Sequence, residues 1–460
     1  MSGKEISTIT FQRLLGFWGG TGKNIFIDNE RIIMNTLGIE DKFYLLDTGI
    51  EIVKLREDER LAEHVIKFPA GLVSQGALQR IGVGLQLFNE GWSDLATFID
   101  PLLFEATDII VDIASLGGGT GTSATIGYLI KWLKYFKDKG IKYTLRPKFL
   151  IVGAMPTLRL DWHRGSRLKA VWLLYYLYRV VDYADKENIW VTPMLQLVII
   201  DNNYFEVKEE TFWLSNKVAG KVVASLLNMF SEDMVKNYYA ERQMDFGEII
   251  SIKDRWPVPY MPYFRVFREN VRSDESIYYD EDFFNLLIED YHGNSSIDND
   301  MINAILEQFL VTYPDDYGLD ANVAIFIGGI HKNQIQGVRN PKKLLDQLYV
   351  STREELVKML SSRGVNNAEI EGIFKVITRV PSYFLLLLST PRGYWELFFE
   401  AAERELEDMS ENEICKKCVI PEVDLDASME GNEIAFRILE PEEVKDWLVM
   451  AINELRKILL

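Results

Sequence analysis

Cysteine is scarce in this sequence, with two residues in 460. Two cysteines exclude a framework of disulfide bonds, and such scarcity is typical of proteins in a reducing compartment. Long apolar runs are also missing, because the longest stretch without charge, 113–130, is interrupted by Gly, Ser and Thr. A membrane-spanning helix needs about 20 mostly apolar residues. We therefore expect a soluble protein with no membrane span.

Positive charge is in deficit, with 50 Lys and Arg against 69 Asp and Glu and a net charge of −19. Nucleic acid is bound through a local excess of cations, so this balance argues against direct binding over the general surface. The N-terminal residues lack a cationic leader followed by an apolar core, which predicts a cytoplasmic protein.

The first half of the chain alternates strand-like and helix-like patterns. Helical periodicity occurs in Ile126–Phe136 and Leu168–Val181. Such alternation predicts an α/β fold with a parallel sheet between two layers of helices. The expected strands are short apolar runs: Ser7–Leu15, Phe43–Leu46, Ile109–Ala114, Lys148–Ala154 and Leu195–Asp201.

The second half begins with a long amphipathic helix, expected from Asn216 to about Tyr239. A stretch rich in Pro and aromatic residues, Arg255–Tyr263, follows as a predicted domain junction. We then expect a smaller α+β domain. The remaining expected features are the strands Val323–Ile330 and Tyr383–Ser389, an acidic segment with exposed loop at Glu403–Asp426, and a terminal helix at Pro441–Leu460.

A run of glycines follows the predicted strand Ile109–Ala114, in Ser115-Leu-Gly-Gly-Gly-Thr-Gly-Thr-Ser123. Glycines let backbone N–H groups approach an anion closely, and the N-terminus of the following helix favours negative charge. A flexible linker is the alternative, but linkers seldom join a buried strand to an apolar helix. The pattern therefore indicates a phosphate-binding loop.

A second glycine cluster, Gly16-Phe-Trp-Gly-Gly-Thr-Gly-Lys-Asn24, follows the first predicted strand. It is not a P-loop, because Phe17 and Asn24 stand where that motif needs Gly and Ser or Thr. It is not a dinucleotide fingerprint either, since Ile25 replaces the last small residue. Two such loops in one sheet predict a polyphosphate held from two sides.

With these loops, the chain resembles the tubulin/FtsZ superfamily of GTPases, in an FtsZ-like, TubZ-like or prokaryotic tubulin-like form. Gly-Gly-Gly-Thr-Gly-Thr at 117–122 resembles the signature loop, with Ser123 where a further glycine is usual. Gly19–Asn24 resembles the first nucleotide loop. In Leu46-Asp47-Thr48, the last two residues resemble the Asn/Asp-Thr pair that ends the second strand in the family.

The resemblance implies a site for GTP or GDP, with Mg²⁺ offsetting the phosphate charge. Asp161 stands where the family places an acidic ribose contact and Arg164 where it places a basic residue. Asn202 and Asn216 stand where the family contacts the base. The implied nucleotide-binding residues are Gly19, Gly20, Thr21, Gly22, Asn24, Asp47, Gly117, Gly118, Gly119, Thr120, Gly121, Thr122, Asp161, Arg164, Asn202 and Asn216.

At the far end of the long helix, Gln243-Met-Asp245-Phe-Gly-Glu248 resembles the loop that the family inserts into the nucleotide site of the next subunit. The resemblance implies that Asp245 and Glu248 are catalytic, with Gln243 in place of the usual Asn. Taken without the resemblance, two acids three residues apart indicate only a solvated face.

The resemblance thus implies a cytoskeletal GTPase that polymerises head to tail and hydrolyses GTP at the subunit interface. The alternative is a binding or regulatory protein of the same fold that has lost hydrolysis, which Gln243 and Ser123 favour. The expected division is 1–215 for the GTPase domain, 216–248 for the central helix and catalytic loop, 249–400 for the second domain, and 401–460 for the acidic segment and terminal helix.

The C-terminal region contains a cysteine pair and an amphipathic helix. Cys415-Lys-Lys-Cys418 has the spacing of half a zinc site or of a redox pair. Two ligands cannot close a tetrahedral site alone, so we expect no metal there, and a zinc shared between subunits or a reversible disulfide is the alternative. The apolar stripe of Pro441–Leu460 predicts either docking on the rest of the chain or binding of an adaptor protein.

Overall fold

The computed structural model describes residues 12–71, 76–105, 107–140, 147–158, 164–189, 195–202, 212–229, 261–263, 321–332, 335–336, 338–362, 369–377 and 383–460. No helix within these ranges combines the length and the apolar character needed to cross a membrane.

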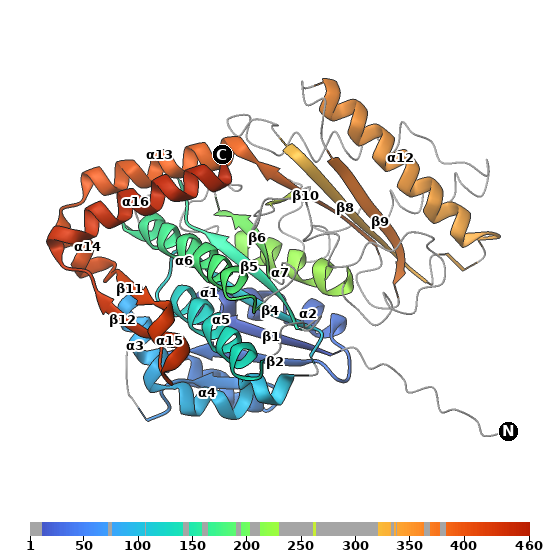
Figure 1. Ribbon diagram of the computed structural model, residues 1–460. Helices are drawn as coiled ribbons and strands as arrows, with labels where there is room; N and C mark the ends of the chain where they lie inside the picture. Colours follow the sequence, from blue (N-terminus) through green and yellow to red (C-terminus); the bar gives the residue numbers. More distant parts are fainter. Residues whose placement is uncertain are drawn as a thin grey trace.

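A sheet of six parallel strands forms the centre of the first half (Figure 1). The strand order is β3-β2-β1-β4-β5-β6, and every neighbouring pair is parallel. This confirms the predicted α/β class, although the three-residue β3 was not predicted. The strands are β1 (Arg13–Trp18), β2 (Lys42–Asp47), β3 (Val65–Lys67), β4 (Ile109–Ser115), β5 (Lys148–Met155) and β6 (Leu195–Asp201).

The prediction for the first strand was wrong in its bounds. Residues 7–11 lie outside the described ranges, and β1 runs to Trp18, past the predicted end at Leu15. Gly16 lies inside the strand and pairs with Tyr44 and Asp112, although glycine suggested a loop. The strand continues because Phe17 and Trp18 bury their side chains on opposite faces of the sheet.

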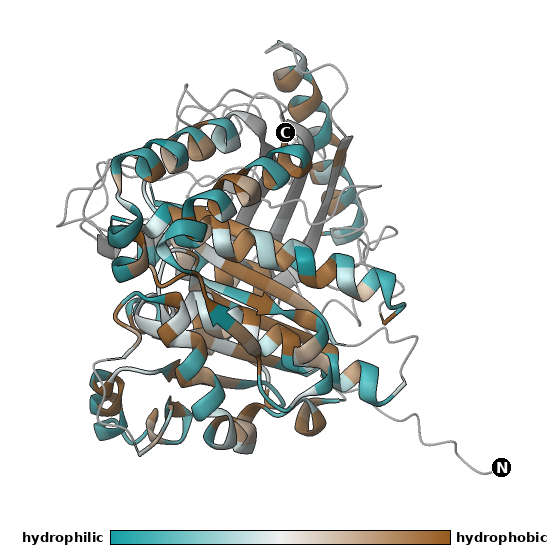
Figure 2. Ribbon diagram, turned by 60° about the vertical axis from the view of Figure 1, so that its left-hand side comes forward, coloured by the Kyte–Doolittle hydropathy of each residue, from teal (hydrophilic) through white to brown (hydrophobic). Residues whose placement is uncertain are grey.

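Helices cover both faces of this sheet. Figure 2 shows its apolar strands enclosed between these layers. Alternate side chains enter two separate cores: Leu14 and Trp18 face one, while Leu15 and Phe17 face the other. One layer consists of α1 (Gly19–Asp28), α2 (Glu30–Thr36) and α7 (Phe212–Met229); the opposite layer contains α3 (Ile81–Glu90), α4 (Trp92–Ile99), α5 (Thr120–Asp138) and α6 (Ser166–Lys186).

Helix α7 begins earlier than predicted. It starts at Phe212, so Asn216 lies within the helix and does not open it. Residues 230–239 of the predicted long helix lie outside the described ranges. The helix packs against α1 and α2 on one side and against strands of a second sheet on the other. It therefore connects the two sheets, as expected for a central helix.

The second sheet is mixed and has the order β7-β10-β8-β9 among the described strands. Strand β8 pairs in parallel with β9 and antiparallel with β10. The prediction of two strands and a smaller α+β unit is confirmed, while β7 and β9 were not predicted. The elements are β7 (Met261–Tyr263), β8 (Ala321–His331), α12 (Pro341–Ser362), β9 (Glu369–Ile377) and β10 (Tyr383–Pro391).

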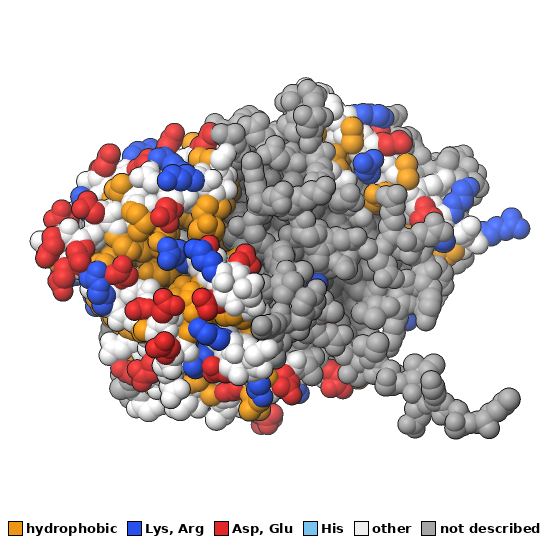
Figure 3. Space-filling view, viewed as in Figure 1, with side chains coloured by type: hydrophobic (Ala, Val, Ile, Leu, Met, Phe, Trp, Pro, Cys, Tyr) orange, Lys and Arg blue, Asp and Glu red, His pale blue; other side chains and the backbone are white. Residues whose placement is uncertain are grey.

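The C-terminal segment returns to the first sheet and covers α6. Acidic side chains gather at the end of the molecule where its helices meet (Figure 3). The expectation of exposed loop within Glu403–Asp426 was wrong for most of that stretch, because apolar side chains such as Leu406 and Ile414 are buried in the core. The elements are α13 (Arg392–Asp408), α14 (Glu411–Lys417), β11 (Pro421–Asp424), α15 (Leu425–Glu430), β12 (Ala435–Ile438) and α16 (Pro441–Leu459).

The apolar stripe of α16 docks on the chain itself. Trp447 lies with its ring centroid 5.2 Å from that of Tyr175 and 6.0 Å from that of Tyr176 on α6. Val444 and Leu448 are fully buried beside it. Of the two roles predicted for this helix, docking is confirmed. An adaptor remains a prediction for its exposed face.

Candidate functional site

The candidate site lies where the connections of the first sheet change direction. Strands β1 and β4 are neighbours, but β1 leads into α1 on one face and β4 into α5 on the other. In open parallel sheets, ligands bind outside the carboxyl ends of strands at such a point. A cavity of about 810 Å³ lies there.

Two helix N-termini point their backbone N–H groups at this cavity. Helix α1 begins at Gly19 and α5 at Thr120, both in the cavity wall. Neither preceding residue, Trp18 or Gly119, caps its helix with a side-chain hydrogen bond. The first N–H groups of each helix are therefore available to an anion, and both dipoles favour negative charge.

Two glycines are required by the packing between the loops. Gly19 has a φ of +67°, a left-handed conformation that favours glycine, and a Cβ there would lie 3.1 Å from the backbone N of Gly121. A Cβ on Gly119 would lie 2.9 Å from both the Ala77 Cβ and the Arg80 backbone N. The two glycine loops and the 76–80 loop thus pack with no room for side chains.

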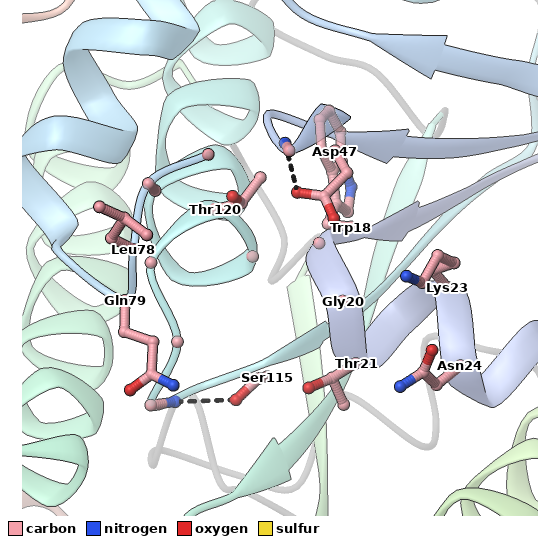
Figure 4. Close-up of a pocket in the computed structure, with 18 of the residues that line it drawn as sticks. Trp18, Gly20, Thr21, Lys23, Asn24, Asp47, Leu78, Gln79, Ser115 and Thr120 are labelled. Atoms are coloured by element: carbon pink, nitrogen blue, oxygen red, sulfur yellow. Dashed lines mark hydrogen bonds between the residues drawn. The ribbon is translucent and has the colours of Figure 1, made fainter. Parts of the chain in front are cut away.

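Most of the predicted nucleotide-binding residues surround this cavity. Figure 4 shows Lys23 and Asn24 reaching into it from α1, opposite Leu78 and Gln79. The predicted residues that line it are Gly19, Gly20, Thr21, Asn24, Asp47, Gly117, Gly118, Gly119, Thr120, Gly121, Asn202 and Asn216.

Three predicted residues do not line the cavity. Gly22 lies against the backbone of Phe17 and Ile113, and Thr122 donates its buried hydroxyl to the Ser115 carbonyl oxygen. Both support the loops from behind. Arg164 points to the C-terminal segment. Asp161, Gln243, Asp245 and Glu248 lie outside the described residues.

A third wall of the cavity was missed from the sequence. It is the loop Gly76–Gln79, joined to the others through Thr48. The Ala77 backbone N donates to Thr48 Oγ1 at 3.0 Å, and Thr48 Oγ1 lies 2.6 Å from Thr120 Oγ1. Gly76 was a turn signal in the sequence, but no strand or helix was predicted immediately on either side of it. Residues of other walls that were also missed are Trp18, Lys23, Gly49, Ile50, Glu51, Ser115, Pro156, Thr157 and Ser166.

Charged side chains of both signs line the cavity, namely Lys23, Asp47 and Glu51. Burial raises the pKa of Asp47, against the opposing effects of hydrogen bonds from the Thr48 and Gly49 N–H groups and of the Lys23 charge. Carboxylate oxygens are the ligands that Mg²⁺ prefers, often together with phosphates of a substrate. Asp47 and Glu51 therefore fit a magnesium–phosphate ligand better than a bare polyphosphate.

Two asparagines that line the cavity have their amide nitrogens held by the protein. Asn202 Nδ2 donates to the Met155 carbonyl oxygen at 2.7 Å. Asn216 Nδ2 donates to Asp28 Oδ2 at 3.1 Å. Their side-chain orientations are thus fixed by residues that do not line the cavity.

Ser123, a departure from the family pattern, does not enter the cavity. Its hydroxyl donates to the Gly119 carbonyl oxygen at 2.8 Å on the side of α3. Cys415 and Cys418 are both free thiols. Within the described ranges, no three His, Cys, Asp or Glu side chains gather as a metal site.

The sequence matches no protein-family model and no curated protein sequence. Solved structures, however, match the fold. CetZ1 from Haloferax volcanii, a GDP-bound monomer, is 14% identical with a TM-score of 0.52, covering 86% of this chain and all of its own. CetZ from Methanosaeta thermophila is 14% identical with a TM-score of 0.50, covering 88% of this chain and 96% of its own.

At this identity the likeness shows the fold alone. The chain has the tubulin/FtsZ fold, as its glycine loops implied. The cavity found here lies at the two glycine loops that carried the resemblance.

Proposed function

We propose that this protein binds GTP or GDP in the cavity and assembles head to tail into filaments, hydrolysing GTP between subunits. One observation carries the proposal: two uncapped helix N-termini, each with a glycine loop, converge at the carboxyl ends of β1 and β4. CetZ1, whose fold this chain shares, is a GDP-bound protein. We also expect a cytoplasmic location.

In this proposal the first turns of α1 and α5 bind the phosphates through backbone N–H groups. Lys23 adds a positive charge on the α1 side, and Asp47 and Glu51 are the residues that would hold Mg²⁺. The ion would neutralise charge that develops on the γ-phosphate during transfer. Asn202 and Asn216 contact the base, with orientations set by the Met155 carbonyl and by Asp28.

Hydrolysis is assigned to residues 243–248 of the neighbouring subunit. Asp245 and Glu248 orient the water that attacks the γ-phosphorus, and the bond to the β-phosphate oxygen breaks, giving GDP and phosphate. Such a divided site makes turnover depend on assembly. The contact is head to tail and does not close on itself, so a filament results.

The test follows turnover and assembly together. GTP hydrolysis by the purified chain should rise more than linearly with protein concentration, and light scattering should increase with GTP but not with ATP. Asp245→Ala should bind GTP and fail to hydrolyse it. Asp138→Ala, which removes an exposed acid at the end of α5, is the matched control. Normal hydrolysis by Asp245→Ala would exclude the divided site.

The alternative is a GTP-binding regulatory protein without turnover. Gln243 favours it, since this residue replaces the family's Asn in the catalytic loop. Ser123 no longer supports it, because that side chain faces α3 and leaves the cavity open. One tightly bound GTP with a negligible hydrolysis rate at every protein concentration would establish this alternative.

A further inference from the structure

The C-terminal segment is attached to the wall of the nucleotide cavity through one buried carboxylate. Glu405, on α13, accepts hydrogen bonds from the backbone N of Gly165 at 2.7 Å and of Arg167 at 3.1 Å. These N–H groups belong to the N-terminus of α6. Glu405 thus supplies the negative charge and the acceptors that this helix end needs.

The same carboxylate forms an ion pair with the Arg167 side chain. Arg167 Nη1 lies 3.1 Å from Glu405 Oε1, and the two side chains are only 6% and 3% exposed. Arg167 Nε donates to the Thr157 carbonyl oxygen at 2.9 Å. Thr157 and Ser166 both line the cavity. A chain of direct contacts therefore runs from α13 through Arg167 to the cavity wall.

Further contacts bring the C-terminal segment to the opposite wall. The backbone N of Ile81 donates to the Cys418 carbonyl oxygen, and that of Gly82 to the Val419 carbonyl oxygen. These bonds hold the start of α3, directly after the loop that lines the cavity. Lys169 Nζ, on α6, donates to the Gln79 carbonyl oxygen of that loop at 3.0 Å.

We propose that Glu405 is a positioning residue for the nucleotide site, through which the C-terminal segment sets how tightly the cavity holds its ligand. Glu405 touches no ligand itself. It fixes Thr157 and Ser166, two residues of the cavity wall, through Arg167 and the N-terminus of α6. The inference rests on the proposed function, because the ligand it concerns is the guanine nucleotide of that cavity.

The test measures dissociation of a fluorescent GDP analogue from the full-length chain. Glu405→Gln leaves the buried Arg167 guanidinium without its carboxylate, and we expect the analogue to leave about tenfold faster than from the wild type. The matched control is Glu403→Gln on the same helix. Its carboxylate pairs with Arg456 of α16 at 2.6 Å, away from the cavity, so dissociation should keep the wild-type rate.

A second readout separates positioning from general stability. Coupling between two sites is reciprocal, so GDP should slow hydrogen exchange of α13 backbone amides in the wild type. Glu405→Gln should lose this GDP-dependent protection, and Glu403→Gln should keep it. Arg167→Lys serves if Glu405→Gln does not fold. It keeps a positive charge beside Glu405 but lacks the Nε–H that donates to the Thr157 carbonyl oxygen, and should also speed dissociation.

The outcomes distinguish this inference from the proposed function. If the wild-type chain does not bind GDP, both the proposed function and this inference are wrong. If the wild type holds GDP, and Glu405→Gln releases it at the wild-type rate, only the role of Glu405 is overturned. If Glu405→Gln cannot be purified, a wild-type rate in Arg167→Lys is sufficient to overturn the proposed link from Glu405 to the cavity wall.

Discussion

The hydroxyl groups of Thr48 and Thr120 lie 2.6 Å apart and join the end of β2 to the start of α5. Thr48 is fully buried and also accepts a hydrogen bond from the Ala77 backbone N. Three loops that are distant in sequence therefore meet at one hydroxyl group. The shape of the cavity depends on this junction.

Thr48→Val should weaken both the fold and the site. The substitution keeps the side-chain shape but leaves the Ala77 N–H and the Thr120 hydroxyl without this partner. We expect the free energy of unfolding to fall by about 1–3 kcal/mol and GDP binding to weaken. Urea unfolding and GDP titration measure these effects. Thr97→Val, which alters an exposed threonine on α4, should change neither quantity.

Gly119→Ala should impair nucleotide binding. The added methyl group would lie 2.9 Å from Ala77 Cβ and from backbone atoms of the 76–80 loop, so that wall must move. We expect a marked loss of affinity for GDP, measured by titration calorimetry. Gly71→Ala is the control, because nothing lies within 4 Å of its added Cβ. Wild-type affinity in Gly119→Ala would contradict the packing argument.

Asp112 should make stability depend on pH. This carboxyl group is buried in β4, where burial raises its pKa to about 7, while the Trp18 indole N–H that donates to it has the opposite effect. The folded pKa lies above the unfolded one, so the folded state binds more protons between about pH 4 and 7. The contribution of Asp112 to the free energy of unfolding is fully present below about pH 4 and is lost as the pH rises to about 7.

The comparison with Asp112→Asn isolates this effect. Across the window the wild type should lose stability relative to the variant by up to about 4 kcal/mol, since each pKa unit corresponds to about 1.4 kcal/mol. Urea unfolding at several pH values measures it. Asp138→Asn, at an exposed position on α5, should run parallel to the wild type. The same parallel course in Asp112→Asn would contradict the prediction.

Trp447→Ala should destabilise the attachment of α16. The indole packs against Tyr175 and Tyr176 and is only 9% exposed, so its removal leaves a large void. We expect a loss of about 3–5 kcal/mol in unfolding free energy, measured with urea. Val449→Ala removes a half-exposed side chain from the same helix and should cost less than about 0.5 kcal/mol.

Local patterns were sufficient for much of the fold. The apolar runs that predicted β2, β4, β5 and β6 are short and buried on both faces, which is a property of the sequence within each strand. The predictions were wrong where contacts with neighbouring strands or helices determine the local structure. Gly16 continues β1 because strands on both sides pair with it. The acidic stretch 403–426 is ordered because its helices pack on α6, α16 and α5.

The sequence by itself determined the glycine loops and the strands they follow, because backbone approach to an anion and burial of a strand need particular residues at short spacing. Only the tertiary structure decided the 76–79 wall, the inward position of Lys23 and the attachment of Glu405 to Gly165, 240 residues away. These depend on which surfaces pack together. The residue pattern within one segment does not specify which distant segment its side chains will contact.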